Sequence, residues 1–517
     1  MRGGTLGVVS AIALAAAAGL VAQRGAPPPS PIPTFQVPAE KLYALEDGLL
    51  RWPLAAADKA YGAIDGKRLY QYVADQTAMS RRYRDQGHPQ FWGRIIGTSA
   101  DDESQQWMLA KFKQFGLTDV RLQTFDLAPQ WMPQSWTVAG TALGKSITLE
   151  TAQPAYATKA TTGEGLDLEA VWLGTGSEAD YIGRNVKGKA VLFASEPLPG
   201  SWRHTGTAEG AVRRAEEKGA AAIFVVIQLP GNIRTQMYPT NTNVPTFSLG
   251  MNDGYMIRDL IGQAGATPPR LKVRLDVRME PGRKTATVWG TLPGETDETI
   301  YVLGHRDGWF EAATDNASGV ATTVGLAEYF AKVPRAERKR TLVFIGTSGH
   351  HNSANMSGTY LLEHRDELFT KTALFINAEH TATLQTYLFG PQIRRANTYS
   401  GLLWYAGGPR RPKLQDLTVK AFKDFGVVTY AEPERAAPGG EMSRLWPFVP
   451  GVQGSDYNMF FHSDHETTDT VPWTGLEAIT RAYAKIIDGV NKLPLSDLQR
   501  PPDPTAPQPP APAPAAR

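Results

Sequence analysis

Apolar strands and amphipathic helices alternate along the chain from about residue 285 to residue 493. Short, uninterrupted apolar runs predict buried strands, and apolar residues spaced three and four apart predict helices with one buried face. The predicted strands are residues 300–303, 341–345 and 373–376, and the predicted helices are residues 318–330 and 474–490. This alternation predicts an α/β fold, a mainly parallel mixed sheet with helices on both faces.

Residues 150–278 have a different pattern from the rest of the chain. Short strands separated by turns dominate there, as in residues 186–193 and 220–226, with one helix at 209–219. We therefore expect an inserted, mostly β domain over 150–278. Residues 41–149 and 279–495 then form a single, discontinuous main domain.

The two ends of the chain do not have the composition of a folded core. Arg2 followed by an apolar run over 5–21 has the layout of a signal peptide covering residues 1–22. An uncleaved anchor is the alternative, but the run is shorter than the ~20 residues that span a membrane. Residues 23–40 form a Pro-rich linker, and residues 496–517 form a Pro- and Ala-rich disordered tail. We expect a secreted or periplasmic protein without stable membrane insertion once the leader is cleaved.

Charge and cysteine content exclude several classes of function. The formal net charge is +2 and no long run of Lys and Arg occurs, so we expect no nucleic-acid partner. The chain has no cysteine, which excludes disulfides and thiolate chemistry. Any metal ligands must therefore be His, Asp or Glu.

Seven of the nine histidines lie between residues 305 and 465, close to acidic residues. His305, Asp315, Glu379 and His465 follow predicted strands or turns, and the carboxyl edge of an α/β sheet is where ligands bind. Imidazoles and carboxylates without thiolates suit zinc or a similar first-row ion. Asp315 could bridge two cations.

Two further aspartates stand at supporting positions near these candidate ligands. Asp307 could accept the second imidazole N–H of His305, and Asp469 could do the same for His465. Both aspartates could instead be ordinary turn residues. The half of the chain that carries the histidines has neither a Gly-x-Ser-x-Gly elbow nor a His-Glu-x-x-His helix, so two other hydrolase classes are not indicated.

The order of these motifs resembles the co-catalytic zinc peptidase family of bacterial aminopeptidases and glutamate carboxypeptidases. The resemblance covers about residues 60–490. Four segments carry it: 304–309 (Gly-His-Arg-Asp-Gly-Trp), 315–320 (Asp-Asn-Ala-Ser-Gly-Val), 375–379 (Phe-Ile-Asn-Ala-Glu) and 465–469 (His-Glu-Thr-Thr-Asp). Residues 150–278 look like the protease-associated domain often inserted in this family. The resemblance implies two zinc ions per chain and a peptide or small amide substrate.

One segment departs from the family's pattern. The resemblance places two adjacent glutamates, a general base and a metal ligand, where this chain has His350 and His351. It therefore implies that His351 is a metal ligand and that His350 is the catalytic base. Because the metal ligands then include only two carboxylates, Asp315 and Glu379, we expect the second zinc to be held weakly.

Three functions remain open from the sequence. The first is an exported zinc peptidase of the aminopeptidase or carboxypeptidase type. The second is a catalytically impaired member acting as a binding protein, as in the transferrin receptors of this family. The third is a hydrolase of non-peptide amides or a cyclase. Arg306, Arg410 and Arg411 are either surface residues or ligands for a substrate carboxylate, and the oligomeric state stays open.

Overall fold

The structure is a computed structural model that describes most of the chain from residue 50 to residue 499. The described residues are 50–142, 144–195, 209–265, 267–351, 356–389, 392–399, 402–406, 411–427, 429–431, 438–456 and 459–499. The expected signal peptide and Pro-rich linker lie outside these residues, as does most of the expected C-terminal tail. Within the described residues, no helix has both the length and the apolar character needed to cross a membrane.

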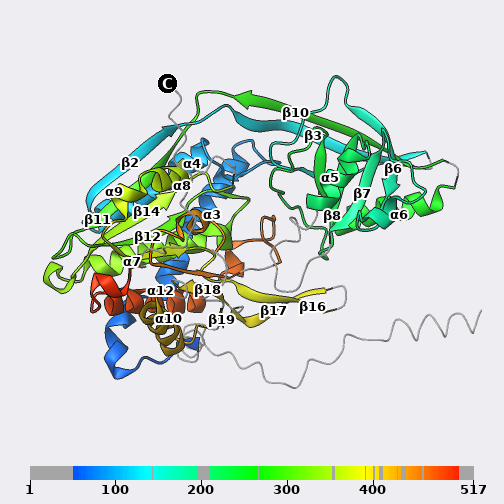
Figure 1. Cartoon of the computed structure of the whole chain (residues 1–517). Coiled ribbons are helices and arrows are strands. Elements are labelled where there is room, and N and C mark those ends of the chain that lie inside the picture. The colour runs from blue at the N-terminus through cyan, green and yellow to red at the C-terminus, as the bar shows by residue number, and fades with distance from the viewer. Residues whose placement is uncertain are drawn as a thin grey trace, which may run out of the picture. The chain divides into compact units, whose positions relative to one another are not determined.

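The main sheet has eight strands in the order β19-β18-β20-β15-β12-β14-β11-β2 (Figure 1). Its centre is parallel, because β12 pairs in parallel with β14 and β15, and β15 pairs in parallel with β20. Toward the edges, β11 pairs antiparallel with both β14 and β2, and β18 pairs antiparallel with β20. The strands are β2 (Thr118–Asp126), β11 (Lys284–Leu292), β12 (Thr299–His305), β14 (Thr341–Thr347), β15 (Thr372–Ala378), β18 (Leu402–Ala406), β19 (Thr429–Ala431) and β20 (Gly451–Ser455).

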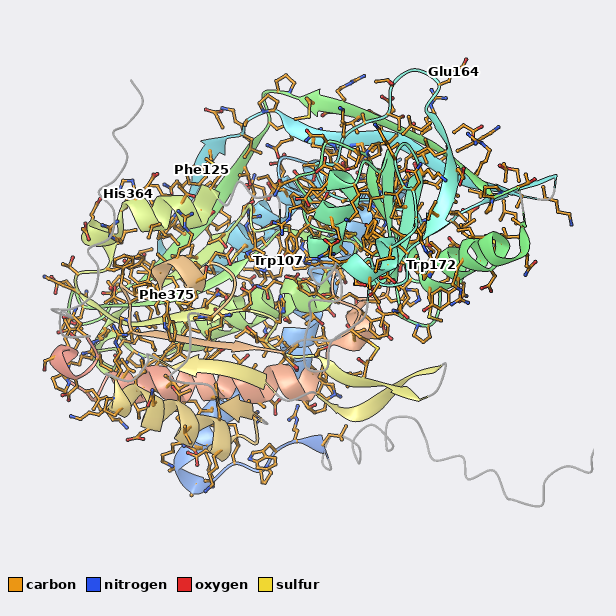
Figure 2. All side chains as sticks on the ribbon, turned by 45° about the vertical axis from the view of Figure 1, so that its right-hand side comes forward. Trp107, Phe125, Glu164, Trp172, His364 and Phe375 are labelled. Atoms are coloured by element: carbon orange, nitrogen blue, oxygen red, sulfur yellow. The ribbon has the colours of Figure 1, made fainter. Side chains whose placement is uncertain are left out.

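Helices cover both faces of this sheet. Alternate residues of β12 point to opposite faces, and Val302 packs in a cluster with α3, α4, α7, α10 and α12. Leu303 packs in another cluster with α8 and α11, as does Phe375 of β15, which is labelled in Figure 2. The helices are α3 (Gly66–Asp85), α4 (Ser99–Gln114), α7 (Gly319–Ala331), α8 (Met356–Glu363), α9 (Arg365–Leu368), α10 (Pro412–Asp424), α11 (Met442–Leu445) and α12 (Trp473–Val490). The predicted α/β fold is confirmed.

A second eight-stranded sheet has the order β4-β3-β10-β6-β7-β8-β9-β5. Its strands are β3 (Gln130–Ala142), β4 (Lys145–Thr148), β5 (Gln153–Pro154), β6 (Leu166–Trp172), β7 (Ala190–Ser195), β8 (Ala222–Ile227), β9 (Thr246–Gly250) and β10 (Arg270–Glu280). Helices α5 (Glu209–Glu217) and α6 (Met251–Gln263) accompany it, and Trp172, labelled in Figure 2, makes an edge contact with Tyr255 of α6. The chain enters on β3 and leaves on β10, which pair antiparallel.

The second sheet differs from the expected insert in two respects. It begins at Gln130 rather than near residue 150, because β3 pairs along β10 as far as Glu280. Its strands β6 to β9 run parallel, so this unit is more α/β in character than expected. The expectation that these residues form a sheet separate from the main one agrees with the strand order.

Two buried arginines hold the loop that follows β12 in place, one from β1 and one within the loop itself. Arg94 lies in β1 (Gly93–Arg94), which pairs with β13 (Gly308–Trp309), and its guanidinium donates to the carbonyls of Arg306, Glu311 and Ala312 at 2.8, 2.8 and 3.0 Å. Arg306 is buried and pairs with Asp101 at 3.1 Å. Neither of the roles considered for Arg306, surface residue or substrate ligand, fits this placement.

The remaining elements are short. A two-stranded ribbon consists of β16 (Leu384–Phe389) and β17 (Gln392–Tyr399). Short helical segments lie at Ala56–Ala63, Glu178–Tyr181, Ala313–Ser318, Arg335–Glu337, Thr468–Thr470 and Leu495–Asp497. The turn Ala313–Ser318 contains Asp315 and leads directly into α7.

Candidate metal centre

The buried carboxylate of Asp315 lies among four imidazoles. Its Oδ1 is 3.1 Å from Nε2 of His305 and 3.0 Å from Nε2 of His380. Its Oδ2 is 2.9 Å from Nε2 of His351 and 2.9 Å from Nε2 of His462. Each oxygen of one carboxylate thus faces a different pair of histidines, which is the arrangement of a residue that bridges two cations.

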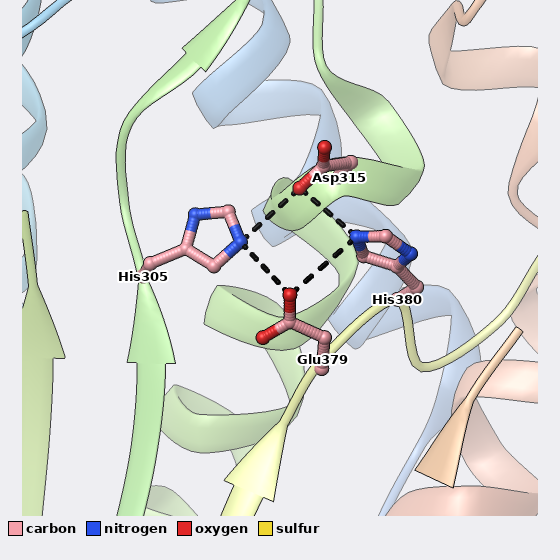
Figure 3. Close-up of side chains that lie close together, drawn as sticks. All are labelled: His305, Asp315, Glu379 and His380. Carbon is pink, nitrogen blue, oxygen red and sulfur yellow. Dashed lines mark ion pairs between the residues drawn. The ribbon is translucent and has the colours of Figure 1, made fainter. Parts of the chain in front are cut away.

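The first group consists of His305, Asp315, Glu379 and His380 (Figure 3). Oε1 of Glu379 is 3.5 Å from Nε2 of His305 and 3.7 Å from Nε2 of His380. A tetrahedral zinc with bonds of about 2.0–2.1 Å separates neighbouring ligand atoms by roughly 3.3–3.4 Å. The distances to Asp315 and Glu379, 3.0–3.7 Å, lie around that value.

Two atoms of this first group lack the partners that buried polar atoms normally have. Nε2 of His305 and Oδ1 of Asp315 are buried and make no hydrogen bond among the described residues. An ion bound by all four side chains would satisfy both atoms. The residues therefore fit a zinc ion in donor type, spacing and unmet bonding capacity.

The second group consists of Asp315, His351 and His462. Asp307 supports it, because Oδ2 of Asp307 accepts a hydrogen bond from the backbone N–H of His351 at 2.9 Å and lies 3.4 Å from its Nδ1. Three protein ligands leave one position of a tetrahedral ion open for water or substrate, whereas four close it. The two candidate metal positions that share Asp315 therefore differ: the first group closes the coordination of its ion, and the second leaves one coordination position open.

Asp307 contacts His305 through its backbone carbonyl rather than through the carboxylate that the sequence suggested. Nδ1 of His305 is 3.1 Å from the carbonyl oxygen of Asp307 and 3.8 Å from its Oδ1. Burial alone would raise the pKa of Asp307, but the hydrogen bond and charge of His351 hold it below its usual range. The ionised carboxylate of Asp307 beside Nδ1 of His351 orients that ring toward Asp315, whereas the backbone carbonyl of Asp307 orients the ring of His305.

His465, expected from the sequence to be the final histidine ligand, does not belong to either group. Its side chain is 49% exposed, and its Nδ1 lies 2.7 Å from Asp464. Asp469, expected to support it, accepts a hydrogen bond from Thr467 instead. His462 takes the expected place, because its backbone turns back at a φ of 58° and directs its buried ring at Asp315.

Glu466 ties the two segments of this group together. Its Oε1 accepts the backbone N–H of Asp315 at 2.6 Å, and its Oε2 accepts that of His462 at 3.0 Å. Burial, followed by the charge of Asp315, raises the pKa of Glu466 well above its usual range. One side chain thus sets the spacing between the bridging aspartate and a histidine that faces it.

The ionisation of the cluster differs from one side chain to the next. Burial lowers the pKa of His462 to about 3, so its imidazole is neutral at physiological pH. Burial would raise the pKa of Glu379, but the charge of His305 lowers it to about 2. Burial would lower the pKa of His305 and of His351, but the charges of Glu379 and Asp315, respectively, raise it, so both rings must lose a proton before they bind a metal as neutral imidazoles.

His350 lies beside the first group rather than inside it. Its ring stacks on that of His305 with centroids 4.3 Å apart, and its Nε2 is 3.9 Å from Oε1 of Glu379. Its Nδ1 is 3.2 Å from Oε2 of Glu441. Burial would lower the pKa of His350, but the charge of Glu441 raises it to about 9.

Sequence reasoning missed four residues of the centre, namely His380, Glu441, His462 and Glu466. His380 and His462 each had an available signal, since His380 directly follows Glu379 and His462 directly follows the apolar pair Phe460 and Phe461. Glu441 lies in a segment without a recognisable pattern, and only the tertiary structure brings it to the centre.

Comparison with known proteins assigns this region to a family. Residues 287–487 match the model of Peptidase family M28, and no curated protein matches the chain. The chain therefore contains a domain of peptidase family M28, a co-catalytic metallopeptidase family, as the sequence motifs indicated.

Solved structures with the same fold cover nearly the whole described chain. BSAP, a zinc aminopeptidase from Bacillus subtilis, has a TM-score of 0.62 at 14% identity, with 84% of this chain and 99% of that chain covered. A Peptidase M28 precursor from Shewanella amazonensis has a TM-score of 0.62 at 18% identity, with 85% and 98% covered. An aminopeptidase from Aneurinibacillus sp. strain AM-1 has a TM-score of 0.53 at 15% identity, with 84% and 95% covered.

The two histidines of the 462–465 turn give a matched pair of variants. We expect His462→Ala to lower the zinc content by one ion per chain, because it removes one of three ligands at the open position. We expect His465→Ala to keep the wild-type zinc content, because that ring is half exposed and faces Asp464. Mass-spectrometric metal analysis of both purified variants measures the difference, and equal zinc loss in both would contradict the geometry.

Proposed function

We propose that the protein is an exported zinc peptidase that hydrolyses a peptide or amide bond. The observation that carries this proposal is the Asp315 carboxylate, whose two oxygens each face two imidazoles at 2.9–3.1 Å. A structural aspartate needs no such set of partners, whereas a pair of adjacent cations does. Peptidase family M28, which matches this part of the chain, supports the same reading.

Two zinc ions would be held by different numbers of side chains. His305, Asp315, Glu379 and His380 would hold one, and Asp315, His351 and His462 would hold the other. Zinc in such a site lowers the pKa of a bound water and polarises a carbonyl group. We expect the ion with three protein ligands to be the weaker of the two and the one that leaves room for substrate.

His350 is the group we assign to proton transfer. Its Nε2 lies 3.9 Å from Oε1 of Glu379 in the first group, and its ring lies 5.0 Å from that of His351 in the second. The charge of two bound zinc ions would favour the neutral form of its imidazole. There it would take the proton of the attacking water and return it to the leaving amine, the work of a general base and then a general acid. It stands where the family resemblance expects a glutamate.

The segment between β8 and β9 of the second sheet lies close to the centre. We propose that the unit containing this sheet is a protease-associated domain that limits access of substrate. The ring of Tyr238 lies 4.8 Å from that of His462. The backbone N–H of Gln236 donates to the carbonyl of His462 at 2.8 Å, and Thr235 bridges to Ser463. A unit that bonds directly to the metal-facing turn is placed to restrict substrate size.

Export is proposed on separate grounds. The apolar run after Arg2 has the layout of a cleaved leader. One protein of the same fold, from Shewanella amazonensis, is described as a precursor.

A catalytically impaired binding protein is the second candidate, and a single observation favours it. A histidine, His350, occupies the place of the expected glutamate base. Against it, the buried side chains around Asp315 remain arranged for a cation, which a pure binding surface would not need.

The experiment is hydrolysis by the zinc-loaded protein of aminoacyl amides, dipeptides and N-acylated amino acids. Cleavage of aminoacyl amides indicates recognition of a free amino end, and cleavage of acylated amino acids a free carboxyl end. We expect a chelator to abolish cleavage and added zinc to restore it. If the protein holds two zinc ions yet cleaves none of these substrates, the binding-protein function is the better one.

A further inference from the structure

We infer that Glu441 is the positioning residue for His350, holding the imidazole by Nδ1 so that Nε2 faces the metal centre. The inference rests on the proposed function for its catalytic consequence, although the placement of the ring can be tested without any activity.

Glu441 lies immediately before α11, far in sequence from His350, and its side chain is fully buried. Its Oε1 accepts a hydrogen bond from Oγ1 of Thr347 at 3.2 Å, at the end of β14. Its Oε2 makes no hydrogen bond among the described residues, and it lies 3.2 Å from Nδ1 of His350. A buried carboxylate oxygen is costly without a donor, so Oε2 has a reason to hold the imidazole there.

The other edge of the same ring faces the centre. Nε2 of His350 lies 3.9 Å from Oε1 of Glu379, and the ring stacks on His305 at an interplanar angle of 14°. The two ring nitrogens therefore have different surroundings, with a carboxylate behind Nδ1 and the candidate metal ligands in front of Nε2. A carboxylate at one nitrogen of a histidine fixes the orientation of the ring and leaves the other nitrogen for chemistry.

The segment that carries Glu441 fits closely against the centre. Gly440 has a φ of +69°, and a Cβ there would come within 3.0 Å of both carboxylate oxygens of Glu379. Any larger residue would therefore push this segment away from Glu379. The close approach brings Glu441 to His350.

The test is a double-mutant cycle in the zinc-loaded enzyme. We expect Glu441→Gln to lower kcat by about 10- to 100-fold, the cost usual for losing such an outer carboxylate. KM and the two zinc ions should be unchanged. In the His350→Ala background, Glu441→Gln should cause no further loss, because Glu441 acts through that ring. Glu441→Asp, which keeps the charge, should recover part of the loss.

Glu477→Gln is the matched control. Glu477 is also a buried carboxylate, but it lies on α12, where it pairs with Arg481 and accepts the N–H of Gly66. We expect this variant to keep the wild-type kcat even if its thermal stability falls. A fall in kcat equal to that of Glu441→Gln would show that loss of any buried carboxylate is enough, and would overturn the inference.

Two further outcomes would overturn the inference. Loss of a zinc ion in Glu441→Gln would make Glu441 a ligand rather than a positioning residue. An equal loss of kcat with and without His350 would show that Glu441 acts by another route.

If the wild type proves inactive, the proposed function fails but the placement of the ring can still be decided. Crystal structures of the zinc-loaded wild type and of Glu441→Gln then provide the readout. We expect Nδ1 of His350 within hydrogen-bond distance of Glu441 in the wild type and a rotated ring in the variant. A His350 ring in the same orientation in both structures would overturn the inference.

Discussion

Replacing Asp315 with asparagine should remove at least one of the two zinc ions and lower kcat/KM by at least about 10³-fold. The amide keeps one oxygen and puts an NH₂ group, which cannot bind a cation, in place of the other. Because each oxygen of Asp315 faces a different pair of histidines, either orientation of the amide leaves one position without its shared ligand. Loss of one electrostatic donor in an active site already costs about 10²–10³-fold, and this change weakens two cation positions at once.

Zinc per chain and kcat/KM for the best amide substrate are the measurements for Asp315→Asn. Asp464→Asn is the control, since Asp464 is an aspartate of the nearby 462–465 turn that pairs with His465 rather than with the centre. We expect the control to keep both ions and wild-type activity. Two tightly held zinc ions in Asp315→Asn would show that this carboxylate does not bridge.

The second large effect concerns His350. We expect His350→Ala to lower kcat by at least about 10²-fold with both zinc ions retained, because a general base contributes about 10²–10⁴ to the rate. His350 stands outside both groups around Asp315, so its loss leaves those side chains in place. His350→Glu restores the residue type that the family resemblance expects and should keep or raise the activity.

His364→Ala is the matched control for this pair of variants. His364 lies between α8 and α9, is 41% exposed and faces Glu367. Its removal should change neither kcat nor zinc content. A His350→Ala enzyme with wild-type kcat and full zinc would show that another group carries the proton, and the role assigned to His350 would be withdrawn.

The candidate ligands at the ends of regular elements could be predicted from the sequence. His305 ends β12, Glu379 follows β15, and Asp315 lies in the turn before α7. The carboxyl ends of parallel strands meet at one edge of a sheet, so strand prediction alone brought these three residues together. His351 follows β14 at the same edge, and the family resemblance identified it.

The choice between His462 and His465 could not be made in the same way. Both lie in an irregular turn, where no periodicity fixes the direction of a side chain. The direction is set by the carboxylate of Glu466, which accepts N–H groups from residues 315 and 462. Such a contact depends on the folded chain, and the sequence-based assignment of His465 was wrong for that reason.

The predictions of the boundary of the second sheet and of the role of Arg306 failed for similar reasons. Strand-like residues continue from β2 into β3, so the pattern does not mark the point where the chain passes from one sheet to the other. Arg306 stands between His305 and Asp307 in sequence, which suggested a role at the site. The alternation of a strand directs it away from the centre, to Asp101.

The measurement that tests the central claim most directly is a crystal structure of the zinc-loaded protein with anomalous scattering recorded at the zinc edge. We predict two peaks, one on each side of Asp315. His305, Glu379 and His380 should surround the first, and His351 and His462 the second, at ligand distances of about 2.0–2.2 Å. No peak beside Asp315, or a peak bound by His465 instead of His462, would contradict the account.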